Sequence, residues 1–177
     1  MKIHDKTKMV SSIFSWKDWN AYHRMRHRVY ERFKETNKVD FYGSGCGKEL
    51  DYKLDAIKDY MFSIVIENNI EDGLFTEKLL DCFLSGTIPI YVGNKNNREF
   101  FDENGIIFFE GDEDLPNILD NLNEELYNSK VESVKKNFEL AKNYMFPEQL
   151  IQKFLEEYKD KIQFIADLHY QYIVKKI

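Results

Sequence analysis

Two short polar motifs near the middle of the chain contain the residues best suited to chemistry. Glu67 and Asn68 directly follow the apolar run 61–66. Glu77 and Lys78 open a segment with helical spacing. A carboxylate, an amide and an ammonium can together bind the hydroxyls and phosphates of a ligand. Because the helix dipole disfavours lysine in the first turn, Lys78 indicates a facing anion, and the motifs predict a local anion site.

The segments around these motifs read as a strand, a helix and a second strand. The run 61–66 is apolar and partly β-branched, as expected for a buried parallel strand. Thr76 is a suitable N-cap for a helix over 77–84, the pair 85–86 ends that helix, and 88–92 predicts the next strand. In open parallel sheets, ligands lie beyond the carboxyl ends of strands and near helix N-termini. Both motifs are therefore expected at one site.

The rest of the chain continues this alternation. We predict strands over 8–14, 39–42 and 105–109, helices over 23–35 and 114–123, and connections over 15–22, 50–58 and 94–104. From residue 124 the pattern is helical, with a break near 145–147 and an apolar last helix. The alternation predicts an α/β fold with a Rossmann-like parallel sheet flanked by helices. We expect this α/β domain over 1–145 and a helical extension over 146–177 that packs on it or on a partner.

Composition and charge limit the classes of function. The 177 residues, 43% of them hydrophobic, suffice for one domain with a core. A net charge of −6 argues against broad nucleic-acid binding. No apolar run is long enough to span a bilayer, and no signal peptide is recognisable, so we expect a cytoplasmic protein, or a peripheral membrane association in a full-length form. Cys46 and Cys82 are expected to be reduced thiols.

Several other charged groups have structural interpretations. Arg24, Arg28 and Arg32 recur at spacing four and indicate a solvated helix face, whereas Arg26 lies on a different side. The acidic run 112–114 is typical of a region that caps a helix N-terminus.

A metal ion is not expected at the predicted anion site. His23 and His27 have a spacing that allows a metal site, but no third ligand lies nearby in the sequence. No DxD-like pair of carboxylates accompanies the candidate cations. A metal-independent diphosphate site fits this pattern, with arginine and lysine supplying the countercharge.

A series of ordered motifs resembles the α1,3-fucosyltransferases. These motifs are EN at 67–68, FTEK at 75–78, SGT at 85–87 and PIYVG at 89–93, preceded by an arginine-led helix at 26–33 and a short strand at 39–43. The likeness covers roughly residues 8–120. It implies the C-terminal, donor-binding half of a two-domain GT-B enzyme of glycosyltransferase family 10, which uses GDP-fucose with inversion.

The resemblance also implies a role for five residues. Arg26 and Lys78 would bind the donor diphosphate and stabilise its charge as it leaves, and Asn68 would contact phosphate or sugar. Glu77 would hydrogen-bond donor hydroxyls. Glu67 would brace the site from the end of its strand. Fixed cations beside a departing diphosphate would lower the barrier to transfer.

Two departures from the family pattern bear on function. Leu74 stands where the family commonly has tyrosine, so a ring and a hydroxyl are missing, and Phe75 would replace only part of the stacking surface. The acceptor domain of the family, which supplies a carboxylate base, has no counterpart in this sequence. We therefore expect a donor domain for GDP-fucose or a related GDP-sugar, with little transfer by this chain alone.

The remaining expectations concern partners. A glycan acceptor would be reached through a further domain, no cofactor is expected, and the apolar last helix predicts self-association. The alternative function is a catalytically inactive nucleotide-binding or interaction module that retains the fold.

Overall fold

A parallel five-stranded sheet with the order β2-β1-β3-β4-β5 organises the molecule. The computed structural model describes residues 1–144 and 159. The strands are β1 (Lys8–Ile13), β2 (Asp40–Tyr42), β3 (Tyr60–Ile66), β4 (Ile88–Val92) and β5 (Ile107–Phe108). The chain divides into two units, Met1–Ala141 and Lys142–Ile177, and the sheet belongs to the first. The predicted parallel sheet is confirmed.

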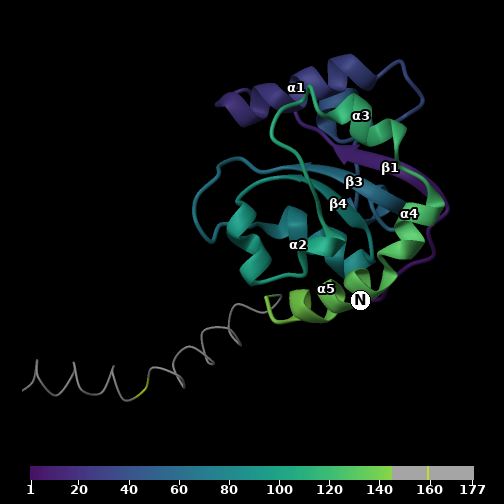
Figure 1. The fold of residues 1–177 in the computed structure, drawn as a ribbon. Helices are drawn as coiled ribbons and strands as arrows, with labels where there is room; N and C mark the ends of the chain where they lie inside the picture. The colour runs from purple at the N-terminus through teal and green to yellow at the C-terminus, as the bar shows by residue number, and fades with distance from the viewer. Residues whose placement is uncertain (145–158, 160–177) are drawn as a thin grey trace, which may run out of the picture. The chain divides into compact units, whose positions relative to one another are not determined.

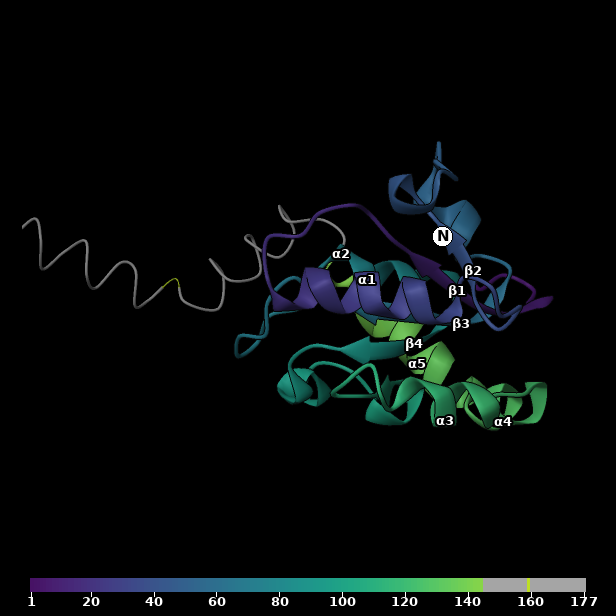
Figure 2. The ribbon, with the colours of Figure 1, turned by 90° about the horizontal axis from the view of Figure 1, so that it is seen from above.

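Helices cover both faces of this sheet. They are α1 (Ala21–Phe33), α2 (Glu77–Ser85), α3 (Leu115–Asp120), α4 (Glu124–Ser129) and α5 (Val131–Lys142), with short 3-10 helices η1 (Ser44–Cys46), η2 (Lys53–Ala56), η3 (Lys95–Glu99) and η4 (Glu103–Gly105). Figure 1 shows α1 and α3 on one side of the sheet and α2 on the other. Seen from above, α1 runs alongside β1 and β3 (Figure 2). No helix within residues 1–144 is long and apolar enough to cross a membrane.

Strand β3 is the centre of the core. All seven of its residues are buried. Phe62, Ile64 and Ile66 belong to the apolar cluster that also contains buried residues of α1 and α3. The ring of Tyr127 in α4 lies 6.1 Å from that of Phe62, on the same face. A strand covered on both faces favours apolar residues, which explains the largely apolar sequence of β3; its one serine, Ser63, is buried and hydrogen-bonded to Ser11.

The strand order reverses direction between β1 and β3. The chain passes from β1 outward to β2, and then returns to place β3 on the other side of β1. The connections that leave the carboxyl ends of β1 and β3 therefore diverge. In open α/β sheets such a point leaves a crevice in which ligands bind.

The ends of several elements differ from the prediction. Helix α1 begins two residues early, because the Asn20 side chain accepts hydrogen bonds from the backbone N–H groups of Tyr22 at 3.0 Å and His23 at 2.9 Å. The predicted connection 94–104 contains η3 and η4, and β5 has only two residues. The helical stretch after residue 124 divides at Lys130 into α4 and α5. The break at 145–147 and the extension 146–177 lie outside the described residues, apart from position 159.

The arginine stripe lies on an exposed helix face, as predicted, since Arg24, Arg28 and Arg32 are all exposed. Two of its members also bind a buried carboxylate. Arg28 approaches Asp112 to 2.7 Å, and Arg32 donates to the Asp112 backbone oxygen at 2.8 Å. The Asp112 side chain is only 7% exposed, so these arginines tie α1 to the connection between β5 and α3. Arg24 pairs with Asp18 at 3.6 Å, and both side chains are exposed. Within the acidic run, Asp114 is the N-cap residue of α3, whereas Asp112 binds Arg28 and Arg32.

Candidate functional site

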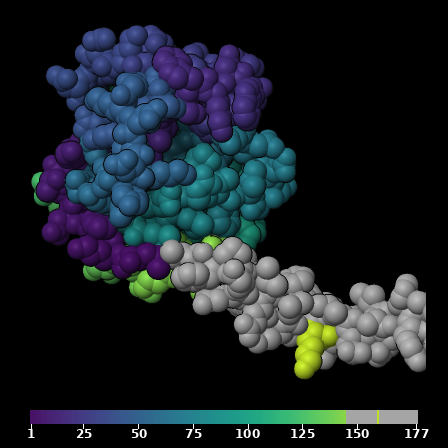
Figure 3. All heavy atoms as spheres, turned by 180° about the vertical axis from the view of Figure 1, so that it is seen from behind, coloured from purple at the N-terminus to yellow at the C-terminus, as the bar shows by residue number. Residues whose placement is uncertain are grey.

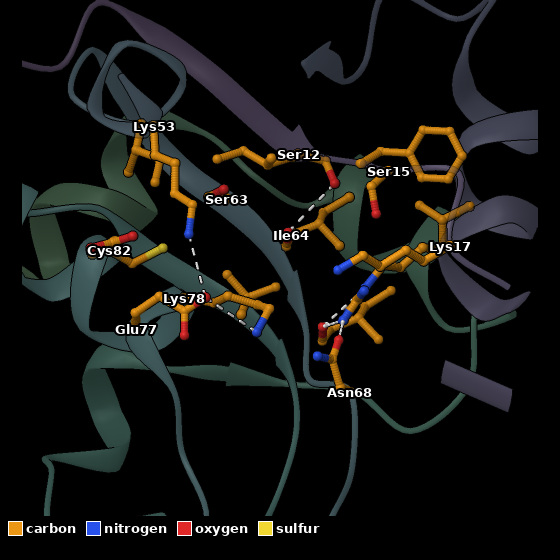
Figure 4. Close-up of a pocket in the computed structure, with 18 residues that line it drawn as sticks. Ser12, Ser15, Lys17, Lys53, Ser63, Ile64, Asn68, Glu77, Lys78 and Cys82 are labelled. Carbon is orange, nitrogen blue, oxygen red and sulfur yellow. Dashed lines mark hydrogen bonds and ion pairs between the residues drawn. The ribbon is translucent and has the colours of Figure 1, made fainter. Parts of the chain in front are cut away.

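A cavity of about 290 Å³ lies at the carboxyl ends of β1 and β3, where the strand order reverses (Figure 4). The charged and amide side chains that line it are Lys17, Arg26, Lys53, Asn68, Glu77, Lys78 and Asp81. Figure 3 shows the segment between β2 and β3, in blue, beside the teal residues that follow it. Four cations and two carboxylates give the lining a net charge of +2, although the chain carries −6. A positively charged lining is the feature that an anion site requires.

Arg26 and Asn68 form one end of this cavity. The Arg26 guanidinium donates from Nε to the Ile66 backbone oxygen at 3.1 Å and from Nη2 to Asn68 Oδ1 at 2.7 Å. Asn20 donates to the Asn68 backbone oxygen at 2.9 Å. The Nη1 group has no hydrogen-bond partner among the residues that the structure describes. Burial lowers the pKa of Arg26, and the negative charges of Glu67 and Glu77 oppose this shift. The hydrogen bonds to Ile66 and Asn68 orient the guanidinium and leave its Nη1 donors for a ligand.

Glu67 is a buried carboxylate that supports the start of α2. It is fully buried and accepts hydrogen bonds from the Thr76 backbone N–H at 3.1 Å and the Thr76 hydroxyl at 2.8 Å. Lys78 Nζ lies 3.3 Å away, and the Tyr91 hydroxyl donates to Oε1 at 3.4 Å. Asn97 in turn donates to the Tyr91 hydroxyl at 3.1 Å. Glu67 therefore links the end of β3 to the start of α2, and it is not among the cavity-lining residues.

Lys78 lies in the first turn of α2 and reaches the cavity from there. Its ammonium donates to the Thr76 hydroxyl at 2.9 Å and lies 3.6 Å from Glu77 Oε1. The anion that the sequence predicts opposite Lys78 is present within the protein, since Glu67 faces it. The carboxylate offsets the unfavourable helix dipole and holds the ammonium in place. With 28% of its side chain exposed, Lys78 remains accessible to a ligand.

Glu77 is shared between two ammonium groups. Lys53 Nζ lies 3.3 Å from Glu77 Oε1, and Lys78 is the second partner. Burial alone would raise the pKa of Glu77, but Lys78 and Lys53 hold it below its ordinary value. The group is therefore an ionised hydrogen-bond acceptor on the cavity wall. Arg26, Asn68, Glu77 and Lys78 are thus brought to one cavity.

Two residues that the sequence places near the ligand lie elsewhere. Leu74 is not among the cavity-lining residues. The ring of Phe75 packs against Phe100 and Phe101, with centroids at 5.7 Å and 5.1 Å. The expectation that Phe75 supplies a stacking surface at the cavity is wrong, because its ring belongs to this aromatic cluster.

Three charged residues of the cavity were not predicted from the sequence. Lys53 comes from η2, in a stretch that reads only as a polar connection, and no sequence signal marks it. Lys17 follows the carboxyl end of β1, and ligands of open parallel sheets bind beyond the carboxyl ends of strands. Asp81 lies four residues after Glu77 on the same helix face, and this spacing is visible in the sequence.

His23 and His27 both contact the backbone of the segment that precedes α1. His23 Nδ1 accepts from the Trp19 backbone N–H at 3.3 Å, and His27 Nε2 contacts the Lys17 backbone oxygen at 3.0 Å. Within the described part of the chain, no three His, Cys, Asp or Glu side chains group together as a metal site would require. Both cysteines are free, and burial raises the pKa of Cys82 to about 12, so this cavity-lining thiol is protonated and unreactive.

The fold and the site together define a parallel α/β domain with a positively charged cavity at its topological switch point. The family model described as glycosyltransferase family 10 (fucosyltransferase), C-terminal, matches residues 3–150. The chain therefore belongs to this family. The predicted Rossmann-like sheet of the C-terminal half of a GT-B glycosyltransferase is confirmed.

Individual relatives agree with this assignment. A fucosyltransferase-like protein of Arabidopsis thaliana is 39% identical over 79 residues, 42% of this chain and 15% of that protein. Human 4-galactosyl-N-acetylglucosaminide 3-alpha-L-fucosyltransferase 9 is 29% identical over 101 residues, 55% of this chain and 27% of that protein. A crystal structure of an alpha1,3-fucosyltransferase with GDP-fucose has a TM-score of 0.57 at 21% identity, over 75% of this chain and 39% of that one. The chain thus spans less than half the length of these relatives.

Proposed function

We propose that this chain is the donor-binding domain of a fucosyltransferase-type enzyme that uses GDP-fucose or a related GDP-sugar. In the complete two-domain enzyme, the sugar would be transferred with inversion to a glycan hydroxyl. The support from relatives is that solved alpha1,3-fucosyltransferases of the same fold contain GDP-fucose or GDP. The proposal concerns binding by this chain, and transfer by a longer assembly.

The observation that carries the proposal is the excess of cations in the cavity of an acidic chain. Arg26 and Lys78 flank Asn68 and come from elements on opposite sides of the crevice. A guanidinium with free donors and an ammonium at a helix N-terminus are groups that bind phosphate oxygens. A diphosphate is negatively charged and so complements a lining that stays positive even when Glu67, the buried partner of Lys78, is counted.

The same residues suit the charge changes of glycosyl transfer. As the bond between sugar and diphosphate breaks, negative charge builds on the leaving group, and Arg26 and Lys78 would stabilise it. Because Ile66, Asn68 and Glu67 hold these cations before a ligand arrives, little reorganisation is needed. We propose that these side chains supply the countercharge without a metal ion. The base that activates the acceptor hydroxyl would come from an N-terminal acceptor domain.

Calorimetric titration with GDP tests the proposal. Wild type should bind GDP, and Arg26→Ala and Lys78→Ala should each weaken binding about tenfold or more, since each loses a charge-assisted contact to phosphate. Lys58→Ala is the control, because Lys58 pairs with Asp55 and lies outside the cavity lining. Failure of the wild type to bind GDP would contradict the proposal.

A transfer assay separates the donor domain from a complete enzyme. With GDP-fucose and a lactosamine-type acceptor, we expect little or no product from this chain. GDP binding without transfer would also be the outcome for an inactive nucleotide-binding module. The two differ on addition of an acceptor domain from a family member, which should restore transfer only for the donor domain. Robust transfer by the chain alone would refute the need for a second domain.

A further inference from the structure

Two buried side chains outside the cavity are connected to Lys78 through Glu67. Tyr91 in β4 and Asn97 in η3 are fully buried and are not among the cavity-lining residues. The Tyr91 hydroxyl donates to Glu67 Oε1 at 3.4 Å, and Asn97 Nδ2 donates to the Tyr91 hydroxyl at 3.1 Å. Glu67 Oε2 lies 3.3 Å from Lys78 Nζ. A continuous chain of polar contacts therefore runs from η3 to a cation of the cavity.

The direction of each hydrogen bond in this chain follows from the groups that form it. Asn97 Nδ2 also donates to the Leu74 backbone oxygen at 3.2 Å, and this second acceptor determines which end of the amide faces Tyr91. Because the Tyr91 hydroxyl accepts from Asn97, its own O–H is left for the Glu67 carboxylate. Burial and the charge of Glu67 raise the pKa of Tyr91, so the hydroxyl keeps its proton and remains a donor.

The donors around Glu67 determine how firmly this carboxylate retains Lys78. Oε1 accepts from the Thr76 N–H and from Tyr91, and Oε2 accepts from the Thr76 hydroxyl and from Lys78. Because Glu67 is fully buried, no solvent replaces a donor that it loses. Lys78 is the donor most able to move, since its ammonium ends a flexible four-carbon chain and its side chain is 28% exposed. Without the Tyr91 hydroxyl, the carboxylate would therefore draw the ammonium away from a phosphate.

We propose that Tyr91 and Asn97 are positioning residues for the donor diphosphate. By satisfying Oε1 of Glu67, they leave the Lys78 ammonium able to bind a phosphate oxygen. Neither residue would touch the ligand, because neither lines the cavity. The inference rests on the proposed function, and it adds β4 and η3 to the elements that determine donor affinity.

Calorimetric titration of a Tyr91→Phe variant with GDP tests the proposal. The variant removes only the hydroxyl and keeps the ring, whose centroid lies 6.0 Å from that of Phe108. GDP binding should weaken about fivefold, because the carboxylate then competes more strongly with the phosphate for Lys78. Tyr127→Phe is the matched control, since the Tyr127 hydroxyl is buried, donates to the Gly86 backbone oxygen at 2.8 Å and lies outside the cavity lining. Both variants should lose similar stability in urea, but only Tyr91→Phe should lose affinity.

A double-mutant cycle distinguishes positioning from a general effect on the structure. In a Lys78→Ala background, Tyr91→Phe should not change the GDP affinity further, since the ammonium through which Tyr91 acts is absent. A loss that came from general distortion would remain in this background. Asn97→Asp is a second variant, because the new carboxylate would accept the Tyr91 O–H and draw it away from Glu67. It should weaken GDP binding in the protein that contains Lys78 and have no further effect in the Lys78→Ala background.

The outcomes separate this inference from the proposed function. A wild type that binds GDP no more tightly than Tyr91→Phe does would overturn the positioning role alone. So would an equal effect of Tyr91→Phe in the two backgrounds, or an equal loss of affinity in Tyr127→Phe. A wild type that binds no GDP would overturn both.

Discussion

Replacing Glu67 by glutamine tests how the site is held together. In the native protein, Oε1 accepts from the Thr76 backbone N–H and from Tyr91, and Oε2 accepts from the Thr76 hydroxyl and Lys78. Glutamine keeps the first oxygen but presents an NH₂ group to the Lys78 ammonium, so two donors face each other. A hydrogen bond to a charged group contributes about 1.5–3 kcal/mol. Because Lys78 is 28% exposed, we expect a loss near the middle of this range, about 2 kcal/mol.

Urea denaturation of the two proteins measures this loss directly. The midpoint should fall while the slope stays the same, since the change removes an interaction and does not alter the unfolded chain. Glu77→Gln is the matched control, because that carboxylate is 57% exposed in its ion pair with Lys53, and such pairs contribute about 0.5 kcal/mol. If Glu67→Gln destabilised the protein no more than Glu77→Gln does, the account of Glu67 as the brace of the site would be wrong.

Three further predictions concern stability. Burial lowers the pKa of Lys6 from its ordinary value of 10.5 to about 8. Between these two pH values, the unfolded chain binds more protons at Lys6 than the folded protein does. The free energy of unfolding should therefore rise by about 1 kcal/mol from pH 7 to pH 9. Lys6→Met should abolish this rise in urea titrations at the two pH values, because the other titrating groups are common to both proteins. Asp112→Asn should cost about 1 kcal/mol in urea denaturation by weakening the contact with Arg28, and an unchanged midpoint would contradict this. Gly43→Ala should lower the thermal midpoint, because Gly43 has φ +101° and an added Cβ would lie 2.4 Å from the Phe14 backbone oxygen; an unaltered midpoint would show that the turn can relax.

The unit from β3 to β4 could be predicted from the sequence because its signals are local. The apolar run of β3, the Thr76 cap and the glycine that ends α2 are all read from neighbouring residues, and the cap accepts from the Lys78 N–H as expected. The carboxyl ends of parallel strands lie at the same edge of a sheet, and ligands bind beyond that edge. This rule correctly predicted that Asn68 and Lys78 lie at one cavity.

The features that the sequence did not reveal depend on contacts between distant segments. Lys53 acquires its position only when η2 packs beside α2, and Asp112 meets Arg28 across 84 residues of chain. No periodicity or cap marks such pairs before the fold exists. The division between α4 and α5 at Lys130 was also not predicted from the sequence, because both segments have helical spacing and no glycine or proline separates them.

A crystal structure of this chain with GDP would test the central claim most directly. The account predicts the diphosphate in the cavity at the ends of β1 and β3, with phosphate oxygens within hydrogen-bond distance of Arg26, Asn68 and Lys78. GDP bound elsewhere, for example at the surface between Arg98 and Lys136, with the cavity unoccupied, would contradict it.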